Sequence, residues 1–359
     1  MSASSETIPV TILTGFLGSG KTTLLNHLLT LPGIEQTAVL INEFGQTGLD
    51  HLLVRAIDET TVLLDSGCLC CSVRGDLVDA MRDLFLKRIK GEIPFFTRLL
   101  IETTGMADPA PILHTLMNDP LLGARYRMDG ILTVVDAVNG NATLDRYAES
   151  VKQVAMADRL ILTKADLADY TDIEVLRARL RHLNPAAPLL TSRTDDISLS
   201  ALFEAGLFNT RDKIPDVARW LNAEAYEHAH GPDCGCGSGA CGHTHHHHGS
   251  LHAGENHRHD SHIASFVLAY DAPLSRDRLT ASLSMLLNLC GSNILRIKGI
   301  LYTDDSPEPL ALHVVQHMLY PLSPLAGLEE TNRQSRLVFI THDLPRPTVE
   351  AILGAGAAA

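Results

Sequence analysis

Aromatic side chains and positive charge are both scarce in this sequence of 359 residues. Phe, Trp and Tyr make up 5% of it, with a single Trp, and the formal net charge is −13 at pH 7. Nucleic-acid-binding surfaces need basic patches, and those that bind single strands also use aromatic side chains that stack on bases. We therefore expect no nucleic-acid partner, and no attraction to an anionic membrane surface.

Long apolar runs are also missing. No run reaches the roughly 18 residues of a membrane-spanning helix, and the polar residues 1–7 lack the basic and apolar regions of a signal peptide. We expect a cytoplasmic protein with no membrane partner. The seven Cys agree with this expectation, because six of them lie in two tight clusters. In a reducing compartment such clusters indicate metal ligands or redox groups and not a disulfide framework.

Short apolar runs alternate with amphipathic stretches over the first two hundred residues. This alternation predicts a mostly parallel sheet covered by helices on both faces, an α/β domain that we assign to residues 1–208. The clearest helical patterns are Thr22–Thr30, Leu77–Lys90 and Ile173–Leu183. The expected strands are Ile8–Thr14, Thr37–Asn42, Thr61–Leu64, Arg98–Glu102, Gly130–Asp136 and Arg159–Thr163.

The pattern changes after residue 208. Residues 228–262 hold eleven of the eighteen His and three Cys with very few large apolar side chains, so we expect 209–262 to be a flexible, metal-binding linker. Strands outnumber helices in 263–359, which predicts a smaller α+β domain with an antiparallel sheet. Its expected elements are a helix at Arg278–Leu289 and strands at Ile263–Tyr270, Ile294–Tyr302, Ala311–Gln316 and Leu337–Thr341.

One motif in the first domain indicates a phosphate site. Residues 15–22 read GFLGSGKT, a full match to the P-loop pattern, and they lie between an expected strand and an expected helix. Backbone N–H groups of such a loop point at phosphate oxygens, its Lys reaches the β- and γ-phosphates, and its Ser or Thr hydroxyl binds Mg²⁺. The residues that the motif assigns to the nucleotide are Gly15, Gly18, Ser19, Gly20, Lys21 and Thr22.

A Mg²⁺ site also needs an acidic residue at the end of a neighbouring strand. Glu102 ends the apolar run RLLIE and is the candidate, so Lys21, Thr22 and Glu102 form the predicted catalytic set. Three residues later, Gly105 would let the backbone approach the γ-phosphate. A solvated Glu at the end of a strand is the alternative explanation.

The choice of base depends on TKAD, at 163–166, which follows another apolar strand as the guanine-binding N-K-x-D motif does. Asp166 could accept both donors on the edge of guanine, whereas adenine offers no such pair, and Lys164 would lie along the base. Thr163 stands where Asn is usual, which weakens the preference for GTP over ATP without reversing it. Ser192, after the next apolar run, is a further candidate contact.

Three Cys follow the expected strand at Thr61–Leu64. Cys68, Cys70 and Cys71 lie in GCLCC. Glu43 follows an earlier strand and could reach the same metal ion. Clustered thiolates suit Zn²⁺ in tetrahedral geometry, and an open position suits an ion that is exchanged; Cu(I) is also soft enough. Buried, inert cysteines or a redox pair are the alternatives. Because γ-phosphate orders loops of this kind, metal affinity should depend on the nucleotide, and nucleotide affinity on the metal.

The sequence contains five motifs in the order GFLGSGKTT, NEFG, GCLCC, ETTG-x-ADP and TKAD. In this order they resemble the CobW-like branch of the metal-handling P-loop GTPases, relatives of UreG and HypB. LRIKGILY and HVVQ look like the C-terminal domain of that branch. The resemblance implies GTP, Mg²⁺ and Zn²⁺ as ligands, a client metalloprotein as partner and slow intrinsic hydrolysis. It adds Thr23 to the P-loop contacts and places metal at the C-x-C-C motif.

Other functions stay open at this stage. Cobalamin-making relatives imply cobalt in place of zinc. A passive zinc buffer would use the P-loop only as a structural anchor. A small-molecule kinase shares the P-loop but leaves the Cys cluster and TKAD without a role. The sequence does not decide the oligomeric state, so a homodimer also stays open.

Overall fold

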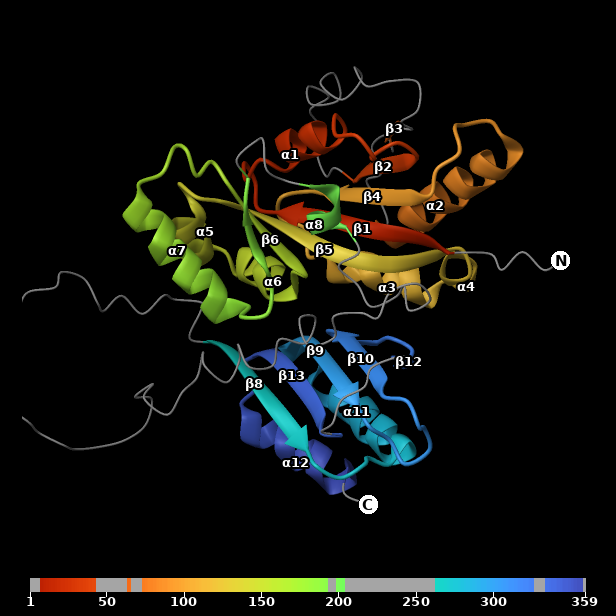
Figure 1. Ribbon diagram of the computed structural model, residues 1–359, viewed down its shortest axis with the longest axis vertical. Coiled ribbons are helices and arrows are strands. Elements are labelled where there is room, and N and C mark those ends of the chain that lie inside the picture. Colours follow the sequence, from red (N-terminus) through yellow and green to blue (C-terminus); the bar gives the residue numbers. More distant parts are fainter. Residues whose placement is uncertain are drawn as a thin grey trace, which may run out of the picture.

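The structure is a computed structural model that describes residues 7–42, 63–65, 73–192, 198–203, 262–325 and 333–357. Within these ranges the chain forms two layered units, one above the other in Figure 1. No helix among the described residues is both long enough and apolar enough to cross a membrane.

The first unit is built on a sheet of seven strands in the order β3-β2-β4-β1-β5-β6-β7. Every pairing in it is parallel, so the carboxyl ends of all seven strands lie at one edge of the sheet. The strands are β1 (Ile8–Gly15), β2 (Thr37–Asn42), β3 (Leu63–Asp65), β4 (Arg98–Thr103), β5 (Tyr126–Asp136), β6 (Arg159–Thr163) and β7 (Leu189–Thr191).

Helices cover both faces of this sheet (Figure 1). Along β1, Val10 and Ile12 belong to the core under one face and Leu13 to the core under the other, so this central strand is buried on both faces. Helices α1 (Lys21–Leu28) and α8 (Leu199–Leu202) pack on the Leu13 face. The remaining helices are α2 (Val73–Lys90), α3 (Ala110–Asn118), α4 (Pro120–Gly123), α5 (Gly140–Arg146), α6 (Ala148–Met156) and α7 (Tyr170–Leu183).

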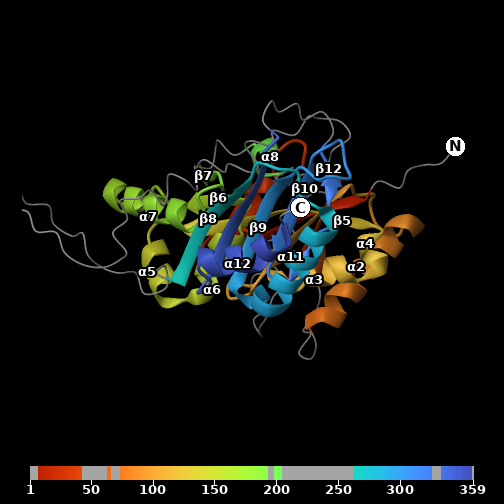
Figure 2. The same cartoon turned by 90° about the horizontal axis from the view of Figure 1, so that it is seen from below.

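The second unit is a six-stranded sheet in the order β11-β10-β9-β13-β8, with β12 paired to β10. All of its pairings are antiparallel. Helices α11 and α12 cover the face that points away from the first unit, as both views show (Figures 1 and 2). The elements are β8 (Ile263–Tyr270), α11 (Arg276–Cys290), β9 (Ile294–Leu301), β10 (Leu310–Val315), β11 (Met318–Leu319), β12 (Ser323–Pro324), β13 (Ser335–His342) and α12 (Arg346–Ala357).

The predicted fold class is confirmed: a parallel P-loop domain precedes a smaller antiparallel α+β domain. The prediction for β5 was too short, because the strand begins at Tyr126 and not at Gly130. Its first residues pair with Ile8–Val10, and the register shifts between Val10 and Thr11 before the pairing continues. Arg127 and Asp129 in this first part interrupt the apolar run that signals a strand. Helix α12, rich in Ala and Gly, was not predicted at all.

A buried ionic cluster joins the two units. Asp158, just before β6, is 5% exposed and lies against Arg296 and Lys298, which are two residues apart on β9. Arg296 donates to the Met156 carbonyl and to Asp158 Oδ1, and Lys298 Nζ lies 3.3 Å from the same oxygen. The other oxygen, Oδ2, accepts the Ile131 N–H at 3.0 Å. Buried charges therefore join the two units beside an apolar contact, in which Leu295 and Ile300 of β9 share a core cluster with residues of α6.

Burial and charge shift the pKa values of this cluster. Burial alone would raise the pKa of Asp158, but the positive charges of Arg296 and Lys298 hold it well below its ordinary value. Burial and the neighbouring Arg296 lower the pKa of Lys298 from 10.5 to about 7, although Asp158 opposes the change. Burial also lowers the pKa of His313, whose ring stacks on Tyr320 at 4.4 Å between centroids. These shifts follow from placing several ionisable groups in one dry interface.

We expect Asp158→Ala to lower the free energy of unfolding by about 3–5 kcal/mol, because it leaves two buried cations without their carboxylate. Chemical denaturation measures this loss. Asp83→Ala is the matched control, since Asp83 and its partner Lys87 form an exposed pair at 2.7 Å, and exposed ion pairs contribute little to stability. Equal losses in the two variants would contradict the interpretation.

The pKa of Lys298 also predicts a pH dependence. Between pH 7 and 10 the unfolded chain keeps the proton of Lys298 while the folded chain releases it, so this residue makes stability rise with pH, by up to about 1 kcal/mol per pH unit. Below pH 7 the folded and the unfolded chain both keep this proton, so Lys298 no longer makes stability depend on pH. In Lys298→Met the rise should be smaller. Melting temperatures measured across this range test it, and parallel curves for the two proteins would show that Lys298 does not titrate there.

Candidate nucleotide site

The P-loop joins β1 to α1 and curls through glycine conformations. Gly15, Gly18 and Gly20 have φ values of 142°, 72° and 91°, all in the region that favours glycine. Lys21, the first residue of α1, is 8% exposed, and its Nζ donates to the carbonyls of Gly15 at 2.9 Å and Phe16 at 3.1 Å. An ammonium group therefore lies over the loop at the N-terminus of a helix, where positive potential gathers.

The predicted Mg²⁺ ligands lie together. Thr22 Oγ1 donates to Glu102 Oε1 at 2.8 Å, although 80 residues separate them in the chain. The pairing of β1 with β4 brings them close, since Leu13 stands opposite Glu102 in the register. Glu102 is 5% exposed. A hydroxyl and a carboxylate side by side are the hard oxygen donors that Mg²⁺ takes, so these residues fit the ion.

Gly105 lies against the P-loop. A Cβ added there would stand 2.5 Å from the Leu17 nitrogen and 2.6 Å from its Cα, so no other residue fits without moving one of the two loops. Two bonds hold the loop on its other side: Gln153 Nε2, on α6, donates to the carbonyls of Ala107 at 2.9 Å and Gly105 at 3.3 Å. The loop after β4 is thus fixed beside the phosphate site.

The TKAD residues contact the P-loop directly. Thr163 Oγ1 donates to the Ser19 carbonyl at 2.6 Å. Lys164 has a φ of 56°, uncommon for a residue with a side chain, and its Nζ donates to the Gly18 carbonyl at 2.7 Å and to Asp136 Oδ2 at 2.8 Å. The two hydrogen bonds of the Lys164 ammonium fix its side chain, and they can offset the cost of the unusual backbone conformation. Asp166 is exposed next to them.

Sequence reasoning missed Asp136, which ends β5. Besides Lys164, it accepts the N–H groups of Val138 at 2.8 Å and Asn139 at 3.2 Å and the side-chain amide of Asn139 at 3.0 Å. Burial would raise the pKa of Asp136, but the bonds from Asn139 and Lys164 hold it below its ordinary value. An acid at the end of an apolar strand, the signal used for Glu102, could have identified it.

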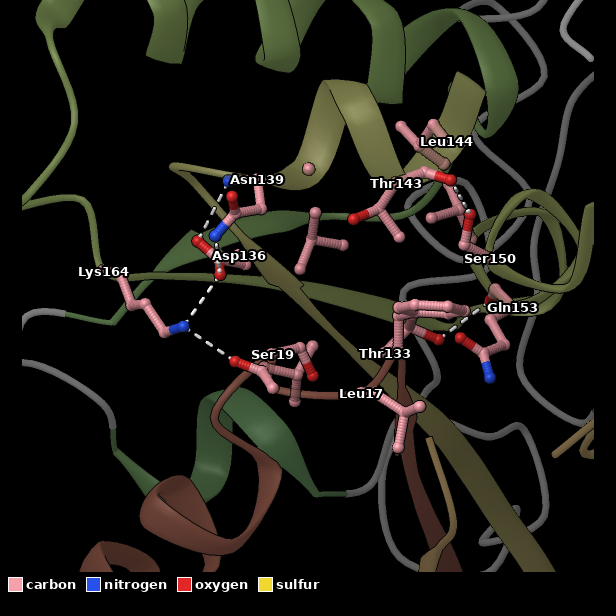
Figure 3. A pocket seen from close by; sticks show the side chains of 16 residues that line it. Leu17, Ser19, Thr133, Asp136, Asn139, Thr143, Leu144, Ser150, Gln153 and Lys164 are labelled. Atoms are coloured by element: carbon pink, nitrogen blue, oxygen red, sulfur yellow. Dashed lines mark hydrogen bonds and ion pairs between the residues drawn. The ribbon is translucent and has the colours of Figure 1, made fainter. Parts of the chain in front are cut away.

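A cavity of about 200 Å³ opens between the P-loop, the end of β5 and helices α5 and α6 (Figure 3). Lys164, Asp136 and Asn139 lie at one end of it, and Ser150 and Gln153 lie at the other. Sites for small molecules usually measure about 300 Å³ or more. The cavity is therefore too small to hold a whole nucleotide.

The predicted thiolate ligands lie outside the described residues. This is true of Cys68, Cys70 and Cys71, of Glu43, and of the His-rich segment up to residue 261. Within the part of the chain that the structure describes, no group of three or more His, Cys, Asp or Glu side chains could hold a metal ion. The roles of all these residues remain predictions. The structure does describe β3, the strand that leads to the Cys cluster.

Comparison with known proteins agrees with this geometry. Residues 9–191 match the family model for the CobW/HypB/UreG nucleotide-binding domain, and residues 263–357 match the model for the C-terminal domain of the cobalamin synthesis protein CobW. The chain belongs to the CobW family. The resemblance inferred from the motifs is therefore confirmed, and so is the prediction of a GTPase.

Individual relatives match either nearly the whole chain or about half of it. The zinc chaperone YjiA of Escherichia coli is 33% identical over 344 residues, which span 96% of this chain and 97% of YjiA. A crystal structure of the Zn(II)-bound YjiA GTPase from E. coli superposes with a TM-score of 0.66, at 31% identity over 98% of this chain and 99% of that chain. The zinc-regulated GTPase metalloprotein activator 1 of Schizosaccharomyces pombe is 37% identical over 203 residues, 54% of this chain and 48% of its own length.

Gly105→Ala should slow GTP hydrolysis by at least about tenfold, because the new methyl group forces the loop after β4 away from Leu17. GDP affinity should change little. Steady-state hydrolysis and nucleotide titration measure the two effects. Gly123→Ala is the matched control: its Cβ would stand 3.9 Å from the Leu116 carbonyl, an ordinary contact. Wild-type turnover in Gly105→Ala would show that the close approach has no role in hydrolysis.

Proposed function

We propose that this CobW protein is a GTP-hydrolysing zinc metallochaperone. It binds Zn²⁺ at Cys68, Cys70 and Cys71, with Glu43 as a further ligand, and transfers the ion to a client metalloprotein in a nucleotide-dependent way. Support for zinc comes from relatives that are named a zinc chaperone and a zinc-regulated metalloprotein activator. Support for a thiolate site comes from the C-x-C-C motif itself.

The observation that carries the proposal is the position of β3. This strand pairs in parallel with β2, which pairs in parallel with β4. Its last residue, Asp65, stands opposite Ile41, and Ile41 stands opposite Glu102. Three residues after Asp65 the chain reaches Cys68. The backbone that leads to the cysteines therefore leaves the sheet at the same edge as the P-loop and Glu102.

The described residues support GTP hydrolysis by positioning and by charge. Lys21 would contact the β- and γ-phosphates in place of the two loop carbonyls, and the N–H groups of the P-loop would surround the phosphates. Thr22 and Glu102 would hold Mg²⁺, which neutralises charge on the phosphates when it is bound. Gly105 brings its backbone beside the P-loop, within reach of a terminal phosphate.

Guanine recognition would depend on Asp166, with Lys164 alongside the base. Thr163 has a single hydroxyl proton, and its bond of 2.6 Å to the Ser19 carbonyl uses that proton. An Asn at this position would have two N–H donors. The proposed site therefore keeps the contact with the P-loop but has one donor fewer for the base.

Nucleotide and metal would affect each other through the chain between them. Residues 43–62 connect β2 to β3, and residues 66–72 connect β3 to α2. A γ-phosphate that orders the first of these segments would change the geometry of the thiolates in the second. Thermodynamic linkage then requires zinc to change nucleotide affinity by the same factor.

Zinc titration tests this proposal. We expect one high-affinity ion per chain that binds at least about tenfold differently with a non-hydrolysable GTP analogue and with GDP. The combined variant Cys68→Ala, Cys70→Ala and Cys71→Ala should lose it. Cys290→Ala is the control, because Cys290 packs against the core of the second unit. Equal zinc affinity with either nucleotide, and with none, would refute the coupling.

Transfer to an apo-metalloprotein client separates a GTP-driven chaperone from a passive buffer. Lys21→Ala should keep its zinc but lose the acceleration of transfer by GTP, because the P-loop loses its ammonium group. A buffer would transfer zinc equally well with or without this lysine. The metal content of the client, measured over time, reports the result.

A further inference from the structure

The hairpin between β10 and β11 has an unusual residue at its turn. Val315 pairs with Met318, so the turn consists of Gln316 and His317. Gln316 has a φ of 51°, a conformation that glycine, Asn or Asp normally supplies in two-residue hairpins. A glutamine there is strained unless its surroundings compensate. Glycine would adopt this conformation without strain, but it has no side chain with which to make a contact.

That side chain reaches the first unit. Gln316 Nε2 donates to Asp108 Oδ2 at 3.2 Å across 208 residues of sequence. The other oxygen of Asp108 accepts the Ala110 N–H at 2.9 Å, at the start of α3. Asp108 belongs to the loop after β4, three residues from Gly105. The second unit thus contacts, through one amide, the loop that lies against the P-loop.

Contacts within the second unit also hold the hairpin turn. A Cβ on Gly291 would stand 2.0 Å from His317 Nδ1, so the imidazole occupies the space that the glycine leaves. The same Nδ1 lies 3.3 Å from the Leu287 carbonyl, on α11. The hairpin turn is therefore anchored in the second unit independently of Asp108, and it can serve as a fixed support for the loop.

A second connection runs through α6. Gln153, only 1% exposed, binds the carbonyls of Gly105 and Ala107, and the same helix ends at Met156, whose carbonyl accepts Arg296 of β9. The loop after β4 is thus contacted by Gln316 of the second unit and by Gln153 of α6, the helix whose last carbonyl binds Arg296. Displacing the second unit would remove the contact from Gln316.

We infer that Gln316 is a positioning residue for GTP hydrolysis, supplied by the C-terminal domain. It holds Asp108 so that Gly105 stays against the P-loop. Hydrolysis therefore requires the C-terminal domain in its present position. By linkage, a nucleotide that favours this loop geometry strengthens the contact between Asp108 and the hairpin.

Gln316→Gly tests this role, because it removes the amide and relieves the strained φ at once. We expect kcat for GTP hydrolysis to fall about tenfold, the effect of losing one hydrogen bond to a charged group, while KM for GTP changes less than about twofold. The melting temperature should stay equal or rise. The control is Gln36→Gly, at an exposed residue with a φ of 63°, where turnover should not change.

Exchanging the amide and the carboxylate between Gln316 and Asp108 provides a second test, in which kcat should be restored. Gln316→Glu places a second carboxylate against Asp108 and should also lower kcat. Adding Asp108→Asn should restore kcat to within about twofold, because the new amide can donate to Glu while its oxygen still accepts the Ala110 N–H. Wild-type kcat in Gln316→Gly would overturn the inference. So would a kcat loss that follows a fall in melting temperature, or a double variant no better than Gln316→Glu.

Discussion

The pairing of β1 with β4 is the contact on which the nucleotide site depends. Because the two strands are parallel neighbours, the P-loop and the loop after β4 leave the sheet side by side. Thr22 consequently lies 2.8 Å from Glu102, and Gly105 approaches Leu17 more closely than any Cβ would allow. A change of register by one residue would turn Glu102 toward the opposite face of the sheet, and both contacts would be lost.

The buried cluster around Asp158 has a comparable role between the two domains. Buried ion pairs often contribute no more stability than apolar side chains of similar volume, since desolvation costs much of what ion pairing contributes. Charged partners, however, tolerate only one arrangement, because any other leaves a charge buried without a partner. We interpret the contact of Asp158 with Arg296 and Lys298 as fixing how the C-terminal sheet lies on α6. In that arrangement Gln316 reaches Asp108.

The cluster around Asp158 and the bond from Gln316 differ in strength and in burial. Arg296 fixes the position of the C-terminal sheet with a fully buried charge, and Gln316 contacts the loop beside the P-loop with a weaker, partly buried hydrogen bond. The parallel sheet places β3, and the chain that leads to the cysteines, at the same edge as this loop.

The P-loop, TKAD and the fold class could be predicted from sequence, because each is a local signal. The phosphate cradle is made within eight consecutive residues, and strand and helix periods repeat every few positions. Glu102 was predictable as an acid that ends an apolar strand. The sequence could not indicate that Gln153, Arg296 and Gln316 support the site, because their partners lie 46, 140 and 208 residues away. A glutamine or arginine has no local signature of such a contact. Tertiary packing decides which distant carbonyl or carboxylate it meets, within the first domain for Gln153 and between the two domains for Arg296 and Gln316.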